Sequence, residues 1–222
     1  MKLAWKPVYL ERKLEVLLKA IELTGKETQT NKLRLHAKID RWREQLLEVQ
    51  TRLAYISRAL IPKLEKLLNV KIRNVELLQV AMFQPSTKNL FLELETHYKN
   101  EGKNPLSNHG FADLIALSEI AQIIALLGDA AIDMGVLYKL WQPDPSNVGH
   151  ITQRKSEIVS NEHMADLCDR WGLYEHRIHF DPEVPSRAEI EHDKGTLIEA
   201  IFGIIQMEHG IGKVIENIKH LF

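Results

Sequence analysis

The feature that most constrains the fold of this chain is a heptad pattern in its first third. A repeat of 3.5 residues over this length predicts a helix with one apolar stripe that faces a partner helix. Pro62 follows the pattern and is expected to break or kink the helix. The apolar positions alternate at spacings of four and three: Leu35, Ile39, Trp42, Leu46, Val49, Leu53, Ile56 and Leu60.

A second, shorter helix is expected upstream. The same spacing occurs at Leu10, Leu14, Leu17 and Ile21, and the polar residues 24–31 separate the two apolar patterns. Polar runs of this kind are typical of turns. The simplest arrangement is an antiparallel helical hairpin. The long seam could instead pair with the same helix of a second chain, and the sequence leaves both arrangements open.

The remainder of the chain also has helical periodicity, so the predicted fold class is all-α. We divide the whole chain into a helical arm over residues 1–61 and a helical domain over residues 62–222. Linkers rich in Gly, Pro, Asn and Asp are expected at 100–108, 142–149 and 180–187. The helices are expected near 75–82, 113–126, 130–141, 152–160, 162–171 and 194–208.

The net charge of −1 hides a strong asymmetry along the chain. Residues 1–73 hold 17 Lys and Arg against 8 Asp and Glu, or +9, while residues 74–222 hold 12 against 22, or −10. Such a pattern predicts either a polyanionic partner for the basic arm or docking of the arm on the acidic part. The arm residues that we expect to contact a polyanion are Lys38, Arg41, Arg43, Arg52 and Arg58.

Composition excludes several classes of protein. Apolar residues make up 45% of the chain, which excludes disorder, and the single cysteine, Cys168, cannot form an internal disulfide. No signal peptide is recognisable, so we expect a cytoplasmic protein. The apolar stretch 111–141 contains Asp113, Glu119, Asp129 and Asp133, and four acids within a bilayer would be costly. We therefore expect no membrane span.

Two acids within apolar helical segments stand out as candidate site residues. Asp129 and Asp133 are four residues apart and share a helix face, and small residues beside Asp129 and Glu199 would let two helices approach closely. A carboxylate on an apolar helix costs several kcal/mol unless it is paired, hydrated or bound to metal. The alternative to a functional site is an ordinary salt-bridged carboxylate near the surface.

Four segments in order resemble the ribonuclease III endonuclease domain. They are residues 64–86, the Leu-Leu-Gly-Asp-Ala of 126–130, residues 148–162, and residues 194–205 with Glu199-Ala200 and Gly203. Phe83 and Gln84 stand where the family has Thr and His. The resemblance covers about residues 62–222. The sequence contains no segment that resembles a double-stranded RNA-binding domain, and residues 87–108 include an insertion expected beside the site.

This resemblance implies a Mg²⁺-dependent endonuclease for double-stranded RNA, with Mn²⁺ as a substitute ion and four metal-binding carboxylates on two helices. Asp129 and Glu199 match the catalytic and metal-binding acids. Ala125 and Thr196 stand where the other two belong, and Gln122 replaces the glutamate that opens the signature. Because alanine has no ligand atom, we expect a degraded centre and weak or lost activity. Glu119, Asp133, Asp193 and Thr196 are the candidate substitutes.

The resemblance also implies a homodimer that pairs beside the signature helix, with Leu126, Leu127 and Ile132 as candidate interface residues. Arg154 and Lys155 join the arm residues as candidate RNA contacts. Few aromatic residues lie among the basic ones, which favours contact with a duplex backbone. Three functions remain open: a double-stranded RNA-binding protein of RNA processing, a divergent active endoribonuclease, and a dimeric protein-interaction module.

Overall fold

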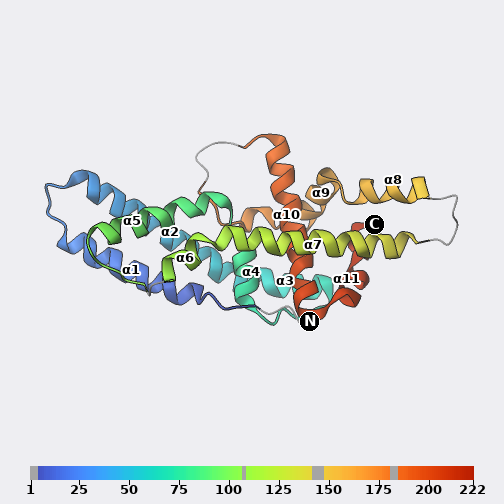
Figure 1. Ribbon diagram of the computed structural model, residues 1–222, viewed down its shortest axis with the longest axis horizontal. Coiled ribbons are helices and arrows are strands. Elements are labelled where there is room, and N and C mark those ends of the chain that lie inside the picture. The colour runs from blue at the N-terminus through green and yellow to red at the C-terminus, as the bar shows by residue number, and fades with distance from the viewer. Residues whose placement is uncertain (1–4, 107–108, 142–147, 181–184) are drawn as a thin grey trace.

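A computed structural model describes residues 5–106, 109–141, 148–180 and 185–222. The all-α prediction is confirmed, because within these ranges the chain forms helices and no strand, apart from an isolated bridge between Phe83 and Ile178. The helices (Figure 1) are α1 (Leu10–Glu27), α2 (Leu33–Tyr55), α3 (Ile61–Leu68), α4 (Val75–Ala81), α5 (Lys88–Asn100), α6 (Gly110–Ile115), α7 (Leu117–Leu140), α8 (Val148–Ile158), α9 (Asn161–Trp171), α10 (Arg187–His209) and α11 (Ile211–Asn217).

The two arm helices pair within one chain. Helices α1 and α2 lie side by side as an antiparallel hairpin (Figure 1). The four apolar positions of α1 and the positions of α2 from Ile39 to Leu53 are all buried. Of the two arrangements left open by the heptad pattern, the structure therefore shows the hairpin.

Of the break or kink expected at Pro62, the break is wrong. Helix α2 continues through a single π-helical turn, Ile56–Leu60, into α3, and the backbone stays helical throughout. In this turn the N–H of Ile61 donates to the carbonyl of Ile56, five residues earlier. The wider turn accommodates a proline, which has no N–H to donate and whose ring would clash with a normal helical turn. The proposed boundary between residues 61 and 62 thus falls inside one continuous helical run.

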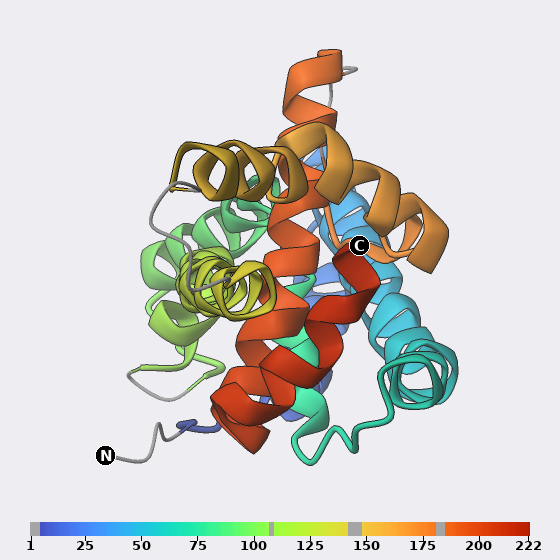
Figure 2. The same ribbon diagram turned by 90° about the vertical axis from the view of Figure 1, so that its right-hand side faces the viewer.

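Helices α7 and α10 form the centre of the molecule. The two helices cross (Figure 2). At the contact Gly128 and Gly203 face the opposite backbone, and a Cβ on Gly128 would lie 1.7 Å from the carbonyl oxygen of Glu199. A Cβ on Gly203 would lie 2.1 Å from the carbonyl oxygen of Ile124. Only glycine allows two helix backbones this close, so the crossing depends on both residues.

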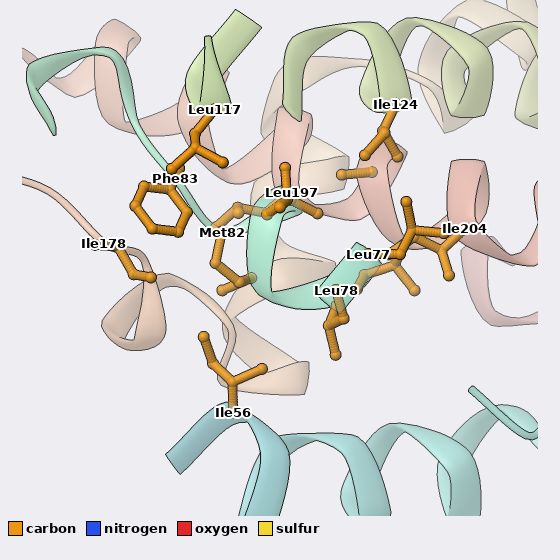
Figure 3. Packing of buried hydrophobic residues seen from close by; sticks show 14 of the residues in the cluster. Ile56, Leu77, Leu78, Met82, Phe83, Leu117, Ile124, Ile178, Leu197 and Ile204 are labelled. Atoms are coloured by element: carbon orange, nitrogen blue, oxygen red, sulfur yellow. The ribbon is translucent and has the colours of Figure 1, made fainter. Parts of the chain in front are cut away.

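A single hydrophobic core joins the arm to the rest of the chain. Ile56, from the turn after α2, packs into the same cluster as Met82, Phe83, Leu117 and Ile178 (Figure 3). Ion pairs add to this docking, because Lys13 on α1 pairs with Asp113 and Arg41 on α2 pairs with Glu93. Acids of the same chain therefore neutralise part of the positive charge of the arm.

The described residues of the insertion, 87–106, do not cover the expected site. Its helix α5 packs against α2 and α6. The indole N–H of Trp42 donates to Glu93 over 2.9 Å, and the ring of Trp42 lies 5.2 Å from that of His97. The residues of this insertion that the structure describes thus support the arm.

Candidate active site

A cleft of about 250 Å³ opens between the end of α4, α7 and α10. It brings together the acids that the resemblance singled out and the positions where acids are missing. Its polar rim consists of glutamine, threonine, histidine and carboxylate side chains. The lining residues of interest are Gln84, Gln122, Ala125, Asp129, His192, Asp193, Thr196 and Glu199.

Local sequence explains how these side chains converge. The crossing at Gly128 and Gly203 sets Asp129 and Glu199 on adjacent helices beside the contact point. Helix α10 begins at a capping box in which Ser186 accepts from the N–H of Glu189 and the Glu189 side chain accepts from the N–H of Ser186. Such a box satisfies two N–H groups that a helix start leaves unpaired. The start of α10, which leads into the cleft, is thus well defined.

The third wall of the cleft is held by the chain after α9. The N–H of Ile178 donates to the carbonyl of Met82 over 2.8 Å, and the N–H of Gln84 donates to the carbonyl of Ile178 over 2.9 Å. These two bonds fix the segment of Phe83 and Gln84 at the cleft edge. Sequence reasoning did not place Phe83, Gln84 or His192 in the site. The sequence pattern that could have indicated His192 is its spacing of four residues from Thr196 and seven from Glu199, which places all three on one helix face.

The two matched acids share an environment that disfavours negative charge. Burial, followed by the nearby charges of Asp129 and Asp133, raises the pKa of Glu199 to about 7. Burial and then Asp133 raise the pKa of Asp129, while Lys155 acts in the opposite direction. Desolvation and like charge both favour the protonated form of a carboxyl group. Glu199 therefore keeps its proton to a higher pH than an ordinary glutamate does.

Of the three candidate substitute acids, one lies in the cleft. Asp193 lines it, next to His192. Asp133 lies outside the lining and pairs with Lys155 of α8 over 2.5 Å. Glu119 also lies outside it and pairs with Lys88 over 2.6 Å.

The residues of the cleft do not fit a magnesium centre of the expected kind. Mg²⁺ prefers charged oxygen ligands in near-octahedral geometry. Ala125 offers no ligand atom and Thr196 offers a neutral hydroxyl, although both line the cleft. In the part of the chain that the structure describes, no group of three or more His, Cys, Asp or Glu side chains is arranged to hold a metal ion.

The candidate RNA contacts divide into two groups. Arg41, Arg154 and Lys155 form ion pairs with acids of the same chain, and Arg52 is bound to Glu48 and to backbone carbonyls. Lys38, Arg43 and Arg58 are exposed, and no ion pair to them is found among the described residues. Of the candidate arm contacts, these three are the ones that remain accessible to a phosphate backbone.

The candidate interface residues on α7 also differ in exposure. Leu126 is 69% exposed and Leu127 is half-buried, but Ile132 is 1% exposed and belongs to the core, so it is not part of a surface. The expectation for Ile132 is wrong because its side chain faces inward, into the core. The exposed apolar face of α7 consists of Ile123, Leu126, Met134, Leu137, Tyr138 and Trp141.

Helix α7 also has the length and composition of a membrane-crossing helix, and among the described helices it alone does. A buried helix of a folded domain has the same properties. Here α7 is the central helix, packed against α4, α10 and α11.

The single cysteine, Cys168, is buried and is not a reactive group. Burial raises the pKa of its thiol to about 12, which disfavours the nucleophilic thiolate.

Residues 122–210 match the family model described as the Ribonuclease III domain. Comparisons with curated proteins and with solved structures found no match. The matched range contains the crossing of α7 and α10 and both acids beside it, Asp129 and Glu199. Over this segment, the chain is similar to the ribonuclease III domain.

Proposed function

We propose that this protein binds double-stranded RNA as a non-cleaving member of the ribonuclease III family and acts in RNA processing. The family comprises endonucleases that process double-stranded RNA, and this chain has its domain. One observation supports the loss of cleavage most strongly: Ala125 and Thr196 line the same cleft as Asp129 and Glu199. The positions for four acids thus converge, but only two carry a carboxylate.

Charge balance supports the same conclusion. Two Mg²⁺ ions bring four positive charges that clustered carboxylates must offset before a phosphate group binds. Here Asp133 is already paired with the ammonium group of Lys155. Asp129, Asp193 and Glu199 are then the carboxylates of the cleft lining that remain to offset the charge of divalent ions.

Affinity for RNA would come from the basic arm. Lys38, Arg43 and Arg58 are exposed on one continuous helical run. A few phosphate contacts of this kind give a sequence-independent dissociation constant on the order of 10⁻⁴ to 10⁻⁶ M that weakens steeply with salt. A filter-binding titration with duplex RNA at rising salt tests this. Absence of retention, or retention that ignores salt, would instead favour the protein-interaction module.

We also propose a homodimer that pairs through the exposed apolar face of α7. Four residues at the end of that helix, Met134, Leu137, Tyr138 and Trp141, line an apolar hollow of about 580 Å³. A contiguous exposed patch of large apolar side chains is typical of an interface. Two copies related by a twofold axis would cover this face on both chains at once. We place this dimer in the cytoplasm, as the single cysteine indicates.

A divergent active endoribonuclease is the second candidate, because Asp193 and His192 line the cleft beside Thr196. Incubation of long duplex RNA with Mg²⁺ or Mn²⁺ distinguishes the two. Our proposal predicts no cleavage by the wild-type protein. Cleavage that disappears in the Asp129→Ala, Glu199→Ala double variant would establish the active enzyme instead.

A further inference from the structure

An aromatic pair lies at the end of α2. Its two rings come from distant parts of the chain, Tyr55 and His176. The ring of Tyr55 stacks on that of His176, with centroids 4.4 Å apart and planes inclined by 28°. The Tyr55 residue is 47% exposed, whereas the His176 side chain is 15% exposed. Tyrosine is thus the outer ring of the pair, and it presents aromatic surface that contributes little to the core.

Hydrogen bonds hold the inner ring in place. The guanidinium group of Arg52, three residues before Tyr55 on α2, donates to the carbonyls of Glu175 over 3.1 Å and Arg177 over 2.8 Å. The same group donates to Glu48 over 2.8 Å. These bonds tie the chain to α2 on both sides of His176. The stack is therefore a rigid feature of the surface.

A shallow hollow lies beside the stack. Its volume is about 320 Å³, and its lining consists of Glu48, Thr51, Arg52, Tyr55 and His176. This size is close to that of the smallest small-molecule pockets, about 300 Å³. It provides two hydroxyl groups, two aromatic rings, a carboxylate and a guanidinium group in one place.

Positive charge exceeds negative charge around the pair. Burial lowers the pKa of His176, and the charges of Lys63 and Arg52 lower it further against the opposing effect of Glu175. Arg58 is exposed one turn after Tyr55. Facing these cations are Glu175, 3.3 Å from His176 Nε2, and Glu48, which pairs with Arg52.

We propose that the Tyr55–His176 pair is a stacking platform for an unpaired nucleotide at the end or bulge of a bound RNA. This inference rests on the proposed RNA binding and specifies which RNA feature the arm recognises. Proteins bind unpaired RNA bases by stacking them on aromatic rings, and such stacking accepts any base. Arg58 and Lys63 contact the adjacent phosphates, while the base extends over the exposed face of Tyr55.

Fluorescence anisotropy with three labelled probes tests the platform. The probes are a blunt RNA duplex of about 16 base pairs, the same duplex with a single unpaired 3′ nucleotide, and a uridine single strand. We expect the overhang to improve binding roughly tenfold over the blunt duplex. Tyr55→Ala and Tyr55→Leu should abolish that gain, whereas Tyr55→Phe should keep it. Leu47→Ala, on the same helix and at a residue 43% exposed, is the matched control and should also keep it.

The outcomes separate this inference from the proposed function. Equal binding of blunt and overhanging duplexes, or a gain that survives in folded Tyr55→Ala and Tyr55→Leu, would overturn the platform and leave duplex binding intact. Binding of the single strand alone, abolished in Tyr55→Ala, would support the platform and overturn the duplex proposal. Absence of binding to all three probes would overturn both. Circular dichroism melting curves establish that each variant is folded.

Discussion

Gly128 on α7 lies against the backbone of Glu199 on α10. The helix that carries Asp129 therefore contacts the helix that carries Glu199 at Glu199 itself. A methyl group on Gly128 would lie 1.7 Å from the carbonyl oxygen of Glu199 and 2.7 Å from the backbone nitrogen of Gly203. Neither group can move without displacing a whole helix. The shape of the cleft is therefore set by this contact.

Gly128→Ala should destabilise the protein severely. Overpacking of a core costs about 1–3 kcal/mol, and a clash with backbone lies at the upper end or beyond. Gly212→Ala is the control, because a methyl group there meets nothing within 4 Å and replaces glycine within α11. Urea denaturation of both variants measures the difference. A Gly128→Ala protein as stable as the wild type would show that the two helices are not in contact.

Stability should fall as the pH rises from about 4.5 to about 7. Since the pKa of Glu199 is raised from 4.5 to about 7, the folded state binds more protons than the unfolded state in this window, and folding weakens as those protons leave. Because Glu199 is partly exposed, we expect a loss of no more than about 3 kcal/mol. Glu199→Gln should remove most of the dependence. Urea denaturation at several pH values measures it, and unchanged pH dependence in Glu199→Gln would contradict the assignment.

Reversal of the free arm charges should weaken RNA binding. The triple variant Lys38→Glu, Arg43→Glu, Arg58→Glu should lower affinity for duplex RNA and reduce the slope of log K against log salt, by about 0.7–0.9 for each phosphate that is no longer neutralised. The matched control reverses three exposed cations of α1, Arg12, Lys19 and Lys26. Equal reductions in both triple variants would indicate a general charge effect and contradict a specific role for α2.

Substitution on the exposed face of α7 should produce monomers. Leu126→Glu with Tyr138→Glu introduces charges at residues that are 69% and 66% exposed, so folding of the single chain should be unaffected. Light scattering after size exclusion should then show a dimeric wild type and a monomeric variant. A monomeric wild type, or association with vesicles that the variant loses, would identify a different role for this face.

Much of the fold followed from periodicity alone. The spacings of Leu10 to Ile21 and of Leu35 to Leu60 predicted two amphipathic helices, with the hairpin as the simpler of two open arrangements. The small residues beside Asp129 and Glu199 predicted the close crossing. The π-helical turn before Pro62 could not be foreseen, because an X-Pro step in a helical pattern usually marks an end. The same limit applies to α7, for which periodicity suggested two segments where the structure has one helix.

Contacts between residues far apart in the chain could not be predicted from the sequence. The carboxylate of Glu76 accepts from the indole N–H of Trp5 and from the N–H groups of Val8 and Leu10, so it caps the start of α1 from another helix. Nothing local to either segment signals this. The pairing of Tyr55 with His176 is hidden for the same reason, since each residue alone resembles an ordinary surface side chain. In the site, Asp129 and Glu199 were found because motifs mark them, whereas the placement of Lys155 against Asp133 depends on tertiary packing.

The central claim is that the cleft has too few carboxylates to hold divalent ions, and calorimetric titration with Mn²⁺ tests it most directly. We expect no saturable binding to the wild type, and binding to appear in the Ala125→Glu, Thr196→Asp variant, which places acids at two positions that line the cleft. Saturable binding of Mn²⁺ to the wild type that disappears in Asp129→Ala, Glu199→Ala would contradict the account.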